Sequence, residues 1–519
     1  MSAMAQFKDK PVALFGTQRW KRLLMYAAGC VGLVMALRTF RFGQSRRVSS
    51  AAPTAAGSYD VLADILHLNN LNEVCFHEKE AIISYGYNST AVDTSLTLHS
   101  TTDHAILIQF LSQCPDVDIY LPPGLRNHGY CEDGMAYVKF LKTRVLPRWV
   151  FDIELQHQGK TIKYFDLCPH TALLFMNHYF DGIPDLADFP PVRTLSLLLP
   201  RFLPASVRPA SSWHSRFVTG KLVVQDKKIV LMPNVEMYEL KASHYHRADY
   251  VLAKTYDGYQ RITAWYDREG NPRRTKVFYT QHVSSDPTQA ARRSPTVQIA
   301  PRDFSNLRFF HANGHSTEKM TYQLLECWSR RPDFPRLDVY SMDDHSKKAF
   351  DRFFKDKPVT NLRYNWGQDV DVVEFGKLMA EVPVILCPSG MEGFGHYINQ
   401  ARASGALVAT TDAAPMNELI DAESGVLIDG NLWTADAPKQ VMAQGYRIFR
   451  EGLFREGMEY MVHPENICAA VDAILALTPT ERAERARRGR QRYLDQFQYF
   501  RTQMHAFRKQ LLFDVHGQV

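Results

Sequence analysis

Residues 382–430 read VPVILCPSGMEGFGHYINQARASGALVATTDAAPMNELIDAESGVLIDG, a strand, a glycine-containing turn, a helix and a second strand in direct succession. The apolar residues 384–386 and 406–409 predict strands buried on both faces, so the segment is typical of a βαβ unit in a parallel sheet. Ligands of such sheets bind at the carboxyl ends of the strands. The turn at 388–395 places Glu392 there, at the start of a helix whose free N–H groups favour an anion. A nucleotide or a sugar phosphate fits this pattern.

The turn resembles the donor-sugar motif of the family 4 retaining glycosyltransferases, in which P-S-x-x-E-G-F-G is followed by a second Glu eight residues after the first. The residues that match are Pro388, Ser389, Glu392, Gly393, Phe394 and Gly395, followed by Ala403, Gly405 and residues 417–419. Position 400, where the family has its second Glu, is Gln400. The resemblance covers roughly residues 305–475. It implies a GT-B fold, two Rossmann-like α/β domains facing across a cleft.

The resemblance also implies roles for the residues of the turn. Glu392 is expected to face the donor sugar hydroxyls, the backbone of 393–395 to approach the sugar and phosphate, and residue 400 to contact the ribose. Gln400 offers one oxygen and an NH₂ group, so the charge-assisted component of that contact, about half of its strength, is lost. His396 lies one helical turn before Gln400 on the same face and could compensate.

A second segment, FFHANGHSTEK at 309–319, reads as strand, glycine turn and helix start. It resembles the phosphate-binding turn of the family, where an Arg and a Lys contact the diphosphate. Lys319 matches the Lys, in the first turns of the expected helix, and His315 occupies the Arg position as a weaker, pH-dependent donor. A solvated surface lysine is the other interpretation of Lys319. We expect Glu392, Lys319 and His315 to be catalytic, with Gly314 and Ser316 among the donor-binding residues.

Cationic side chains and helix N-termini stabilise a diphosphate leaving group without a metal, so neither a metal nor a cofactor is expected besides the nucleotide-diphosphate sugar that serves as substrate. The first domain is expected to bind the acceptor, a glycan, glycoprotein or lipid. Its candidate residues are His128 and Gly129, in a segment that loosely resembles the Gly-Gly-Ala-Glu turn of these enzymes, and Asn234, Glu236 and Lys254, which follow predicted strands. Ordinary turns are the alternative for all of these.

The composition is that of an ordinary globular protein. With 519 residues and 45% hydrophobic content, the chain is long enough for two or three domains. Its formal net charge of +6 is small for this size and does not indicate nucleic-acid binding. The eight cysteines include no C-x-x-C pair, so a structural zinc site is not expected. Cys75, Cys114, Cys131 and Cys168 fall in one half, where they form either disulfides or buried thiols.

The N-terminal region predicts a membrane anchor. Residues 10–58 contain no acidic side chain, and residues 23–37 are uncharged. At 1.5 Å per residue this stretch is roughly 22 Å long, which suits a thin secretory-pathway membrane. We expect a single-pass type II protein that faces the Golgi or ER lumen, a location to which the one glycosylation sequon, at Asn88, adds weak support. A cleaved signal peptide or a mitochondrial presequence is the alternative.

The expected organisation follows from these segments: a cytoplasmic tail at 1–22, the anchor at 23–37, a stem at 38–58, an acceptor domain at 59–302, a donor domain at 303–477 and a terminal helix at 478–519 that crosses back to the first domain. Strands are predicted at 105–111, 117–121, 172–176, 195–199, 228–232, 250–253, 277–280, 307–310 and 337–340, helices at 318–330 and 372–379, a hairpin at 151–162 and a linker at 285–302. Thr478, Pro479 and Glu481 predict the start of the terminal helix.

Two other classes of protein compete with this interpretation. A metal-dependent GT-A enzyme needs an Asp-x-Asp motif, and 116–118 and 369–371 both fit it. A membrane-tethered, non-catalytic GT-B module that binds a nucleotide or glycan would account for Gln400 and His315. Because Glu392 and Lys319 are retained, the sequence favours a glycosyltransferase that moves a hexose from a nucleotide-diphosphate sugar with retention of configuration. On this interpretation Gln400→Glu changes donor affinity modestly.

Overall fold

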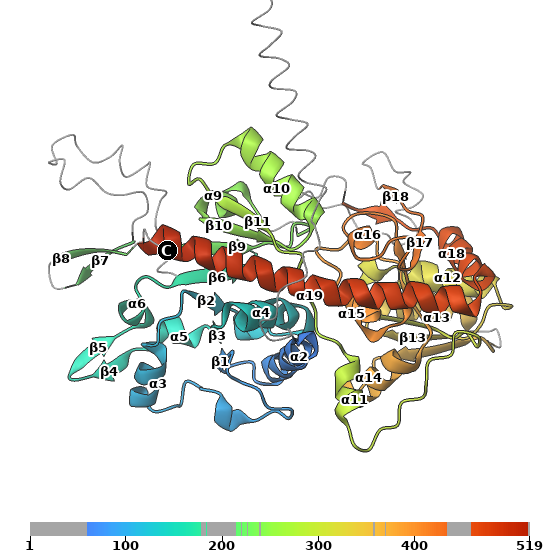
Figure 1. Cartoon of the computed structure of the whole chain (residues 1–519), viewed down its shortest axis with the longest axis horizontal. Coiled ribbons are helices and arrows are strands. Elements are labelled where there is room, and N and C mark those ends of the chain that lie inside the picture. Colours follow the sequence, from blue (N-terminus) through green and yellow to red (C-terminus); the bar gives the residue numbers. More distant parts are fainter. Residues whose placement is uncertain are drawn as a thin grey trace, which may run out of the picture. The chain divides into compact units, whose positions relative to one another are not determined.

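The computed structural model describes residues 60–177, 183, 214–218, 221–225, 227–237, 240–355, 359–368, 370–432 and 458–516 (Figure 1). The predicted tail, anchor and stem, and the strand predicted at 195–199, lie outside these ranges. Within them, no helix combines the length and the apolar composition that crossing a membrane requires.

The first α/β sheet is built from β1(Ile83–Ser84), β2(Val117–Tyr120), β3(Arg144–Leu146), β6(Ala172–Met176), β9(Ile229–Met232), β10(Tyr250–Ala253) and β11(Lys276–Tyr279). Their order across the sheet is β1-β3-β2-β6-β9-β10-β11, and only β1 runs antiparallel to its neighbour. The helices of this half are α2(Val61–His77), α3(His104–Leu111), α4(His128–Leu141), α5(Trp149–Asp152), α6(Tyr164–Leu167), α9(Ala242–Arg247) and α10(Tyr256–Glu269). β2, β6, β9 and β10 are buried at every position, as strands covered on both faces must be.

The second sheet contains β12(Phe309–Gly314), β13(Leu337–Ser341), β14(Leu362–Trp366), β15(Val384–Cys387), β16(Leu407–Thr411) and β17(Val426–Ile428). All its strands are parallel, in the order β14-β13-β12-β15-β16-β17. Its helices are α12(Thr321–Arg330), α13(Asp344–Phe354), α14(Val372–Glu381), α15(His396–Ser404), α16(Met416–Leu419) and α18(Pro464–Ala476). The prediction of two α/β sheets is therefore confirmed, and apart from the edge strand β1 their strands are parallel.

Smaller elements complete the described chain. They are the two-stranded pairs β4(Leu155–His157) with β5(Lys160–Ile162), β7(His214–Val218) with β8(Lys221–Gln225) and β18(Asn431–Leu432) with β19(Tyr460–Met461), the short helices η1(Thr94–Leu96), η2(Pro123–Leu125), η5(Thr317–Lys319) and α11(Thr288–Arg293), and the terminal helix α19(Pro479–His516). The domain boundaries set from the sequence stay predictions.

The strand predicted at 105–111 is wrong, because this segment forms helix α3. The Asp103 side chain caps the helix by accepting hydrogen bonds from the backbone N–H groups of Ala105 and Ile106. Leu107, Ile108 and Leu111 are buried while Ile106 is 50% exposed. The apolar run therefore packs one face, with helical spacing, and is not buried on two faces as a strand would be.

Three further local predictions need correction. The hairpin exists, but its strands start at Leu155, since residues 149–152 form the helical turn α5. The linker at 285–302 contains α11, which packs against α14. The helix predicted at 318–330 is interrupted at Met320, whose φ of 53° is left-handed, so that Lys319 ends η5 and α12 begins at Thr321. Lys319 therefore precedes the helix.

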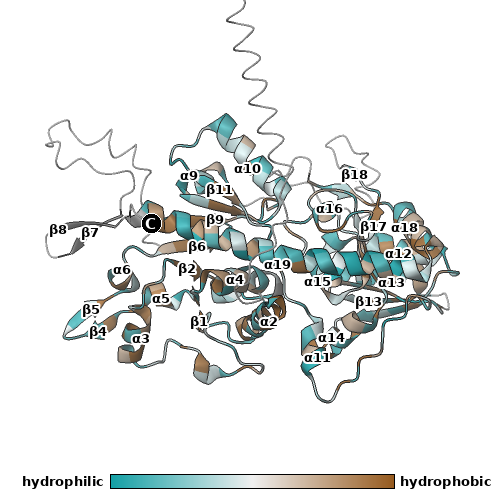
Figure 2. Ribbon diagram, in the orientation of Figure 1, coloured by the Kyte–Doolittle hydropathy of each residue, from teal (hydrophilic) through white to brown (hydrophobic). Residues whose placement is uncertain are grey.

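Helix α19 starts as predicted, with a capping box in which Thr478 and Glu481 bond each other's backbone N–H groups. Polar and apolar residues alternate along it (Figure 2). It contacts α2, α4 and β11 of the first half and α15 and β16 of the second, lying as a long red helix in Figure 1. Its fully buried aromatic residues, Tyr493, Phe497, Phe500 and Phe507, belong to the core of the first half. One element thus completes the packing of residues from both sheets.

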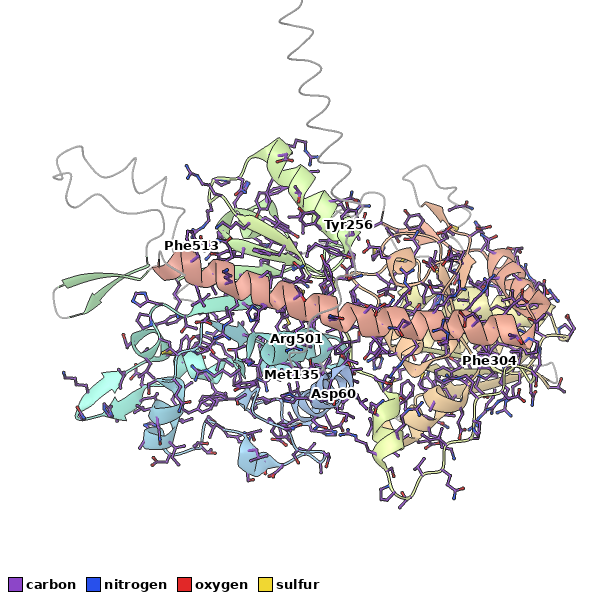
Figure 3. The ribbon with its side chains drawn as sticks, in the orientation of Figure 1. Asp60, Met135, Tyr256, Phe304, Arg501 and Phe513 are labelled. Carbon is purple, nitrogen blue, oxygen red and sulfur yellow. A yellow bond between two sulfur atoms is a disulfide. The ribbon has the colours of Figure 1, made fainter. Side chains whose placement is uncertain are left out.

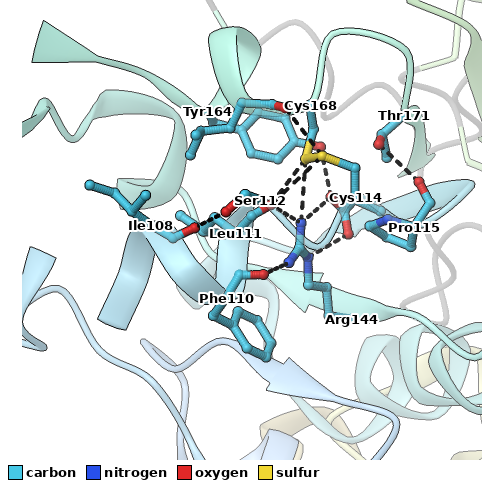
Figure 4. Close-up of a disulfide and its surroundings, with 12 residues drawn as sticks. Ile108, Phe110, Leu111, Ser112, Cys114, Pro115, Arg144, Tyr164, Cys168 and Thr171 are labelled. Atoms are coloured by element: carbon cyan, nitrogen blue, oxygen red, sulfur yellow. Dashed lines mark hydrogen bonds and ion pairs between the residues drawn. A yellow bond between two sulfur atoms is a disulfide. The ribbon is translucent and has the colours of Figure 1, made fainter. Parts of the chain in front are cut away.

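Six cysteines form three disulfides: Cys75–Cys131, Cys114–Cys168 and Cys327–Cys468. The four cysteines of the first half are therefore paired and are not buried thiols. Next to Cys114–Cys168, the Arg144 guanidinium donates hydrogen bonds to the carbonyl oxygens of Phe110 and Leu111, at 2.7 and 3.1 Å (Figure 4). The Cys387 thiol is free and buried at the end of β15.

Candidate active site

The turn at 388–395 connects β15 to α15 at the carboxyl edge of the second sheet. Gly395, with φ of 94°, is the N-terminal cap of α15, and no side chain caps the helix. Since left-handed backbone favours glycine, this residue type is what allows the sharp entry into the helix. The first N–H groups of α15 therefore point into the turn without a side-chain partner at the cap.

Glu392 and Lys319, expected to act together, are in contact. Lys319 Nζ lies 2.5 Å from Glu392 Oε1, and the Ser389 hydroxyl donates to the same oxygen at 2.5 Å. The Lys319 ammonium also lies 3.5 Å from the centroid of the Tyr397 ring, a cation–π contact. Backbone bonding fixes the two turns together, because the Gly390 N–H donates to the Glu318 carbonyl oxygen at 2.9 Å.

This pair can bind both parts of an activated sugar. The ammonium is a compact positive charge suited to phosphate oxygens, and the carboxylate accepts hydrogen bonds from hydroxyl groups. The side chains of Lys319 and Glu392 are 15% and 12% exposed, so their charges are screened less than those of a surface pair. The structure brings the two residues together, and their catalytic roles stay predictions.

His315 lies apart from this pair. It follows Gly314 at the end of β12, its side chain is exposed, and its Nδ1 lies 3.1 Å from the carbonyl oxygen of Met342. The next residue, Ser316, donates its N–H to the Asn313 carbonyl oxygen. No hydrogen bond or ion pair between His315 and Lys319 or Glu392 occurs among the described residues. A second histidine, His311, is buried in β12. Its ring nitrogens contact the Leu386 carbonyl oxygen and the Thr321 hydroxyl, and burial lowers its pKa to about 4.

The two α15 residues expected to bind the donor, His396 and Gln400, contact the first half, and their donor-binding role stays a prediction. Gln400 Nε2 donates to Glu132 Oε1 at 2.8 Å, and His396 Nε2 lies 3.0 Å from Asp133 Oδ1. Glu132 and Asp133 are consecutive residues of α4, and His396 and Gln400 are one turn apart, so one face of each helix meets the other. Glu132 is also bonded by the Ser285 N–H and by Asn72 Nδ2, each at 2.8 Å.

Asp133 is the centre of a buried polar cluster. Lys254 Nζ lies 3.1 and 3.2 Å from its two oxygens, and His282 Nε2 lies 3.0 Å from Oδ1. Burial alone would raise the pKa of the Asp133 carboxyl, yet the Lys254 ammonium and the His396 ring hold it well below its ordinary value. Burial lowers the pKa of His282 to about 4.

Three atoms of this cluster have the spacing of metal ligands. The ligand atoms of Asp133, His282 and His396 lie within 4.8 Å of one another. However, the Lys254 ammonium contacts both oxygens of Asp133 and already supplies the positive charge that a metal ion would bring. In this structure the Asp133 charge is therefore balanced by Lys254.

The two Asp-x-Asp segments are also explained by structure. Asp118 is fully buried and bonds Arg144 Nε at 2.8 Å and the Tyr164 hydroxyl at 2.7 Å. Asp371 caps α14 by accepting the Val373 N–H at 2.9 Å, while Asp369 lies outside the described residues. Asp116 forms an ion pair with Arg508. Each aspartate that the structure describes in these two segments therefore has a structural partner.

The acceptor candidates divide into two groups. His128 and Gly129 begin helix α4, where the Asn127 side chain accepts the Tyr130 N–H. Asn234, Glu236 and Lys254 do lie at the junction of the two halves. Lys254 Nζ donates to the Asn234 side-chain oxygen.

Glu236 touches the donor turn directly. A Cβ atom placed on Gly393 would lie 2.2 Å from Glu236 Oε2, so a larger residue at 393 would displace this carboxylate. The carboxylate of the first half therefore lies against the backbone of the motif in the second half. Burial raises the pKa of Glu236 to about 7.

Glu132, Asp133, His282 and Glu418 were not among the site residues predicted from the sequence. Glu418 accepts the N–H groups of Tyr256 and Asp257 at 2.7 and 2.8 Å, at the start of α10, where Tyr256 is labelled in Figure 3. A signal was present for Glu132 and Asp133, since two adjacent carboxylates interrupt an otherwise apolar helix.

A surface hollow of about 650 Å³ lies elsewhere, between the linker and α14. Its lining residues are Ser294, Thr296, Val297, Asp371, Val373, Glu374, Lys377, Leu378 and Glu381. None of the predicted site residues lines it.

No known protein family matches the sequence, and no curated protein matches it either. Solved structures with a similar fold include the GtfA/B complex (TM-score 0.41, 12% identity, 69% of this chain and 64% of that one), a glycosyltransferase from Rickettsia africae ESF-5 (0.47, 12%, 77% and 99%) and Anabaena Alr3699/HepE in complex with UDP and glucose (0.37, 14%, 55% and 71%). This chain thus spans 64% of the length of the GtfA/B chain.

Proposed function

We propose that this chain is a glycosyltransferase that moves a hexose from a nucleotide-diphosphate sugar to a glycan, protein or lipid acceptor, with retention of configuration and without a metal. The observation that carries the proposal is the contact between Lys319 and Glu392, 2.5 Å from Nζ to Oε1, at the carboxyl edge of the second sheet. A cation for the diphosphate and a carboxylate for the sugar hydroxyls are thereby held side by side.

The chemistry follows from where charge develops. As the glycosidic bond of the donor breaks, negative charge collects on the diphosphate, and Lys319 together with the first N–H groups of α15 stabilises it. Glu392 accepts hydrogen bonds from the sugar hydroxyls. When the donor enters, the phosphate competes with Glu392 for the Lys319 ammonium, so the pair separates while the carboxylate stays oriented by Ser389.

The test uses the full chain, purified in a mild detergent, with UDP-glucose, UDP-N-acetylglucosamine, GDP-mannose and ADP-glucose. We expect release of the nucleoside diphosphate from at least one donor, persistence of activity in EDTA, and an unchanged anomeric configuration in the product by NMR. Loss of activity in EDTA would contradict metal independence. An inverted product would contradict retention.

The second candidate is a non-catalytic GT-B module. The observation that favours it is that Gln400, at the position of the family's second Glu, donates its amide hydrogen bond to Glu132 within the protein. Such a module would bind a nucleoside diphosphate but transfer no sugar. Calorimetric binding of UDP, GDP or ADP without release from any donor would support it over the enzyme.

We further propose a membrane-anchored, lumen-facing protein, anchored through residues 23–37. Three disulfides support an oxidising compartment. Asn88 of the sequon Asn88-Ser89-Thr90 is exposed, although its side-chain oxygen accepts a hydrogen bond from Asn70. Resistance to carbonate extraction and a mobility shift after removal of N-glycans would support this location. Import into mitochondria would favour the alternative.

A further inference from the structure

Five carboxylates of the described chain lie where the two halves meet, and four of them accept hydrogen bonds from other residues. Glu392 is bonded by Lys319 and Ser389, Asp133 by Lys254 and His396, Glu132 by Gln400 and Ser285, and Glu418 by the N–H groups that start α10. The fifth is Glu236. Its Oε2 is buried and, among the described residues, no group hydrogen-bonds it.

A buried carboxylate oxygen without a partner is unfavourable in the free protein, by about 1–3 kcal/mol. Such a group in a native structure calls for an explanation, and a catalytic role toward a bound ligand is one. The position of Glu236 specifies which ligand. Its carboxylate lies against Gly393, in the turn that is expected to hold the donor sugar, while Glu236 itself follows β9 at the carboxyl edge of the acceptor-side sheet.

We propose that Glu236 is the catalytic residue on the acceptor side: its carboxylate accepts the hydrogen bond of the acceptor hydroxyl and removes its proton as the new glycosidic bond forms. This inference rests on the proposed function. In the step, the bond between the sugar's anomeric carbon and the diphosphate oxygen breaks, and its electron pair leaves with the diphosphate. The acceptor oxygen bonds to the anomeric carbon, and its proton passes to Glu236.

The surroundings of Glu236 suit a general base at neutral pH. The groups that act on it electrostatically are Lys254, which favours ionisation, and Glu392 and Asp133, which oppose it, while burial is the largest influence. Together these influences raise the pKa of Glu236 to about 7, which is close to the optimal value for a general base at neutral pH. Lys254 cannot take this role, because its ammonium already donates to Asp133 and Asn234.

The experiment compares the full chain with Glu236→Gln, Glu236→Asp and Glu236→Ala. Release of UDP from UDP-glucose, or of the nucleoside diphosphate from whichever donor of the panel is used, is measured with n-octyl β-glucoside as acceptor. For Glu236→Gln we expect kcat to fall about 10²–10⁴-fold. KM for the donor should stay near that of the wild type, and the melting temperature should not fall. Glu423→Gln, at a side chain that is 83% exposed, is the matched control with unchanged activity.

Two readouts separate proton transfer from a structural role. In the wild type, kcat should fall below about pH 7 as a single group becomes protonated, which gives the pH–rate profile an acidic limb. In Glu236→Gln this acidic limb should be absent. Sodium azide or formate should restore part of the activity of Glu236→Ala, and Glu236→Asp should keep the limb at a lower kcat.

A Glu236→Gln variant with wild-type kcat and an intact acidic limb would overturn this inference while leaving the proposed function in place, provided that Lys319→Ala is inactive in the same assay. If the variant is poorly folded, wild-type kcat in Glu236→Asp without an acidic limb would also overturn it. Absence of nucleotide release by the wild type with every donor would overturn both proposals together.

Discussion

Gln400 and Glu132 form a hydrogen bond that joins the two α/β halves, 2.8 Å from the amide nitrogen to the carboxylate oxygen. This geometry gives a physical reason for glutamine at 400. A carboxylate at that position would face the buried carboxylate of Glu132, so two negative charges would replace a donor and an acceptor. The departure from the family pattern is thus matched by a residue of the other half.

Gln400→Glu is therefore expected to destabilise the fold by about 1–3 kcal/mol, and not merely to change donor affinity. The double variant Gln400→Glu with Glu132→Gln restores one donor and one acceptor and should recover much of the loss. Chemical denaturation of the three proteins is the measurement. Equal stability of Gln400→Glu and the wild type would contradict the role assigned to this hydrogen bond.

Lys319→Ala is expected to lower kcat for nucleotide release about 10²–10³-fold, since it removes the positive charge beside the diphosphate. Lys319→Arg keeps the charge but not the compact ammonium that lies over Tyr397, and should lose less. Steady-state kinetics with the active donor of the panel would measure both. Full activity in Lys319→Ala would show that the contact with Glu392 is structural only.

Glu418→Gln is expected to lower the free energy of unfolding by about 1 kcal/mol. Its two oxygens accept the N–H groups of Tyr256 and Asp257, and the negative charge stabilises the N-terminus of α10. Glu423→Gln, five positions after Glu418, carries the same change at an exposed site and should stay within about 0.5 kcal/mol. Similar values for both variants would contradict the capping role.

The stability of the protein should depend on Glu236 between about pH 4.5 and pH 7. Its pKa is raised in the folded state by burial, so the folded protein binds more protons than the unfolded chain in this window. Stability therefore falls as pH rises through the window, by about 1–3 kcal/mol, and is level above it. In Glu236→Gln this contribution disappears. Melting curves of both proteins from pH 4.5 to 8 would test it, and parallel curves would refute it.

Replacing Cys327 and Cys468 by alanine is expected to lower the free energy of unfolding by about 2–4 kcal/mol, because their disulfide joins α12 to α18 across a long loop. Peptide mapping under non-reducing conditions should recover the three disulfides. Recovery of Cys327 and Cys468 as free thiols from the natively expressed protein would contradict the pairing.

Much of the second half could be predicted from sequence, because its local signals agree with one another. The strands before and after the turn at 388–395 are uninterrupted apolar runs, and the contact of Lys319 with Glu392 follows from two turns at neighbouring strands of one parallel sheet, β12 and β15. The helix α3 was mistaken for a strand because a mostly apolar run of seven residues, 105–111, does not by itself distinguish the helical period from the strand period.

The contacts that were missed are those that depend on tertiary structure. Glu132 and Gln400 are 268 residues apart, and nothing local predicts that α4 and α15 face each other. The same holds for Glu236 and Gly393, whose proximity requires both sheets to be complete. The break at Met320 was also hidden, since methionine is an ordinary helix residue and left-handed backbone is unusual for it.

Helix α19 has a consequence for the order in which the protein acquires its structure. Its residues from Tyr493 to Leu511 insert into the core of the first half, yet they follow every residue of the second half in the chain. During translation, the apolar surface of the first half that α19 covers therefore stays exposed until the rest of the chain has been synthesised. We expect the nascent chain to depend on chaperones over that interval.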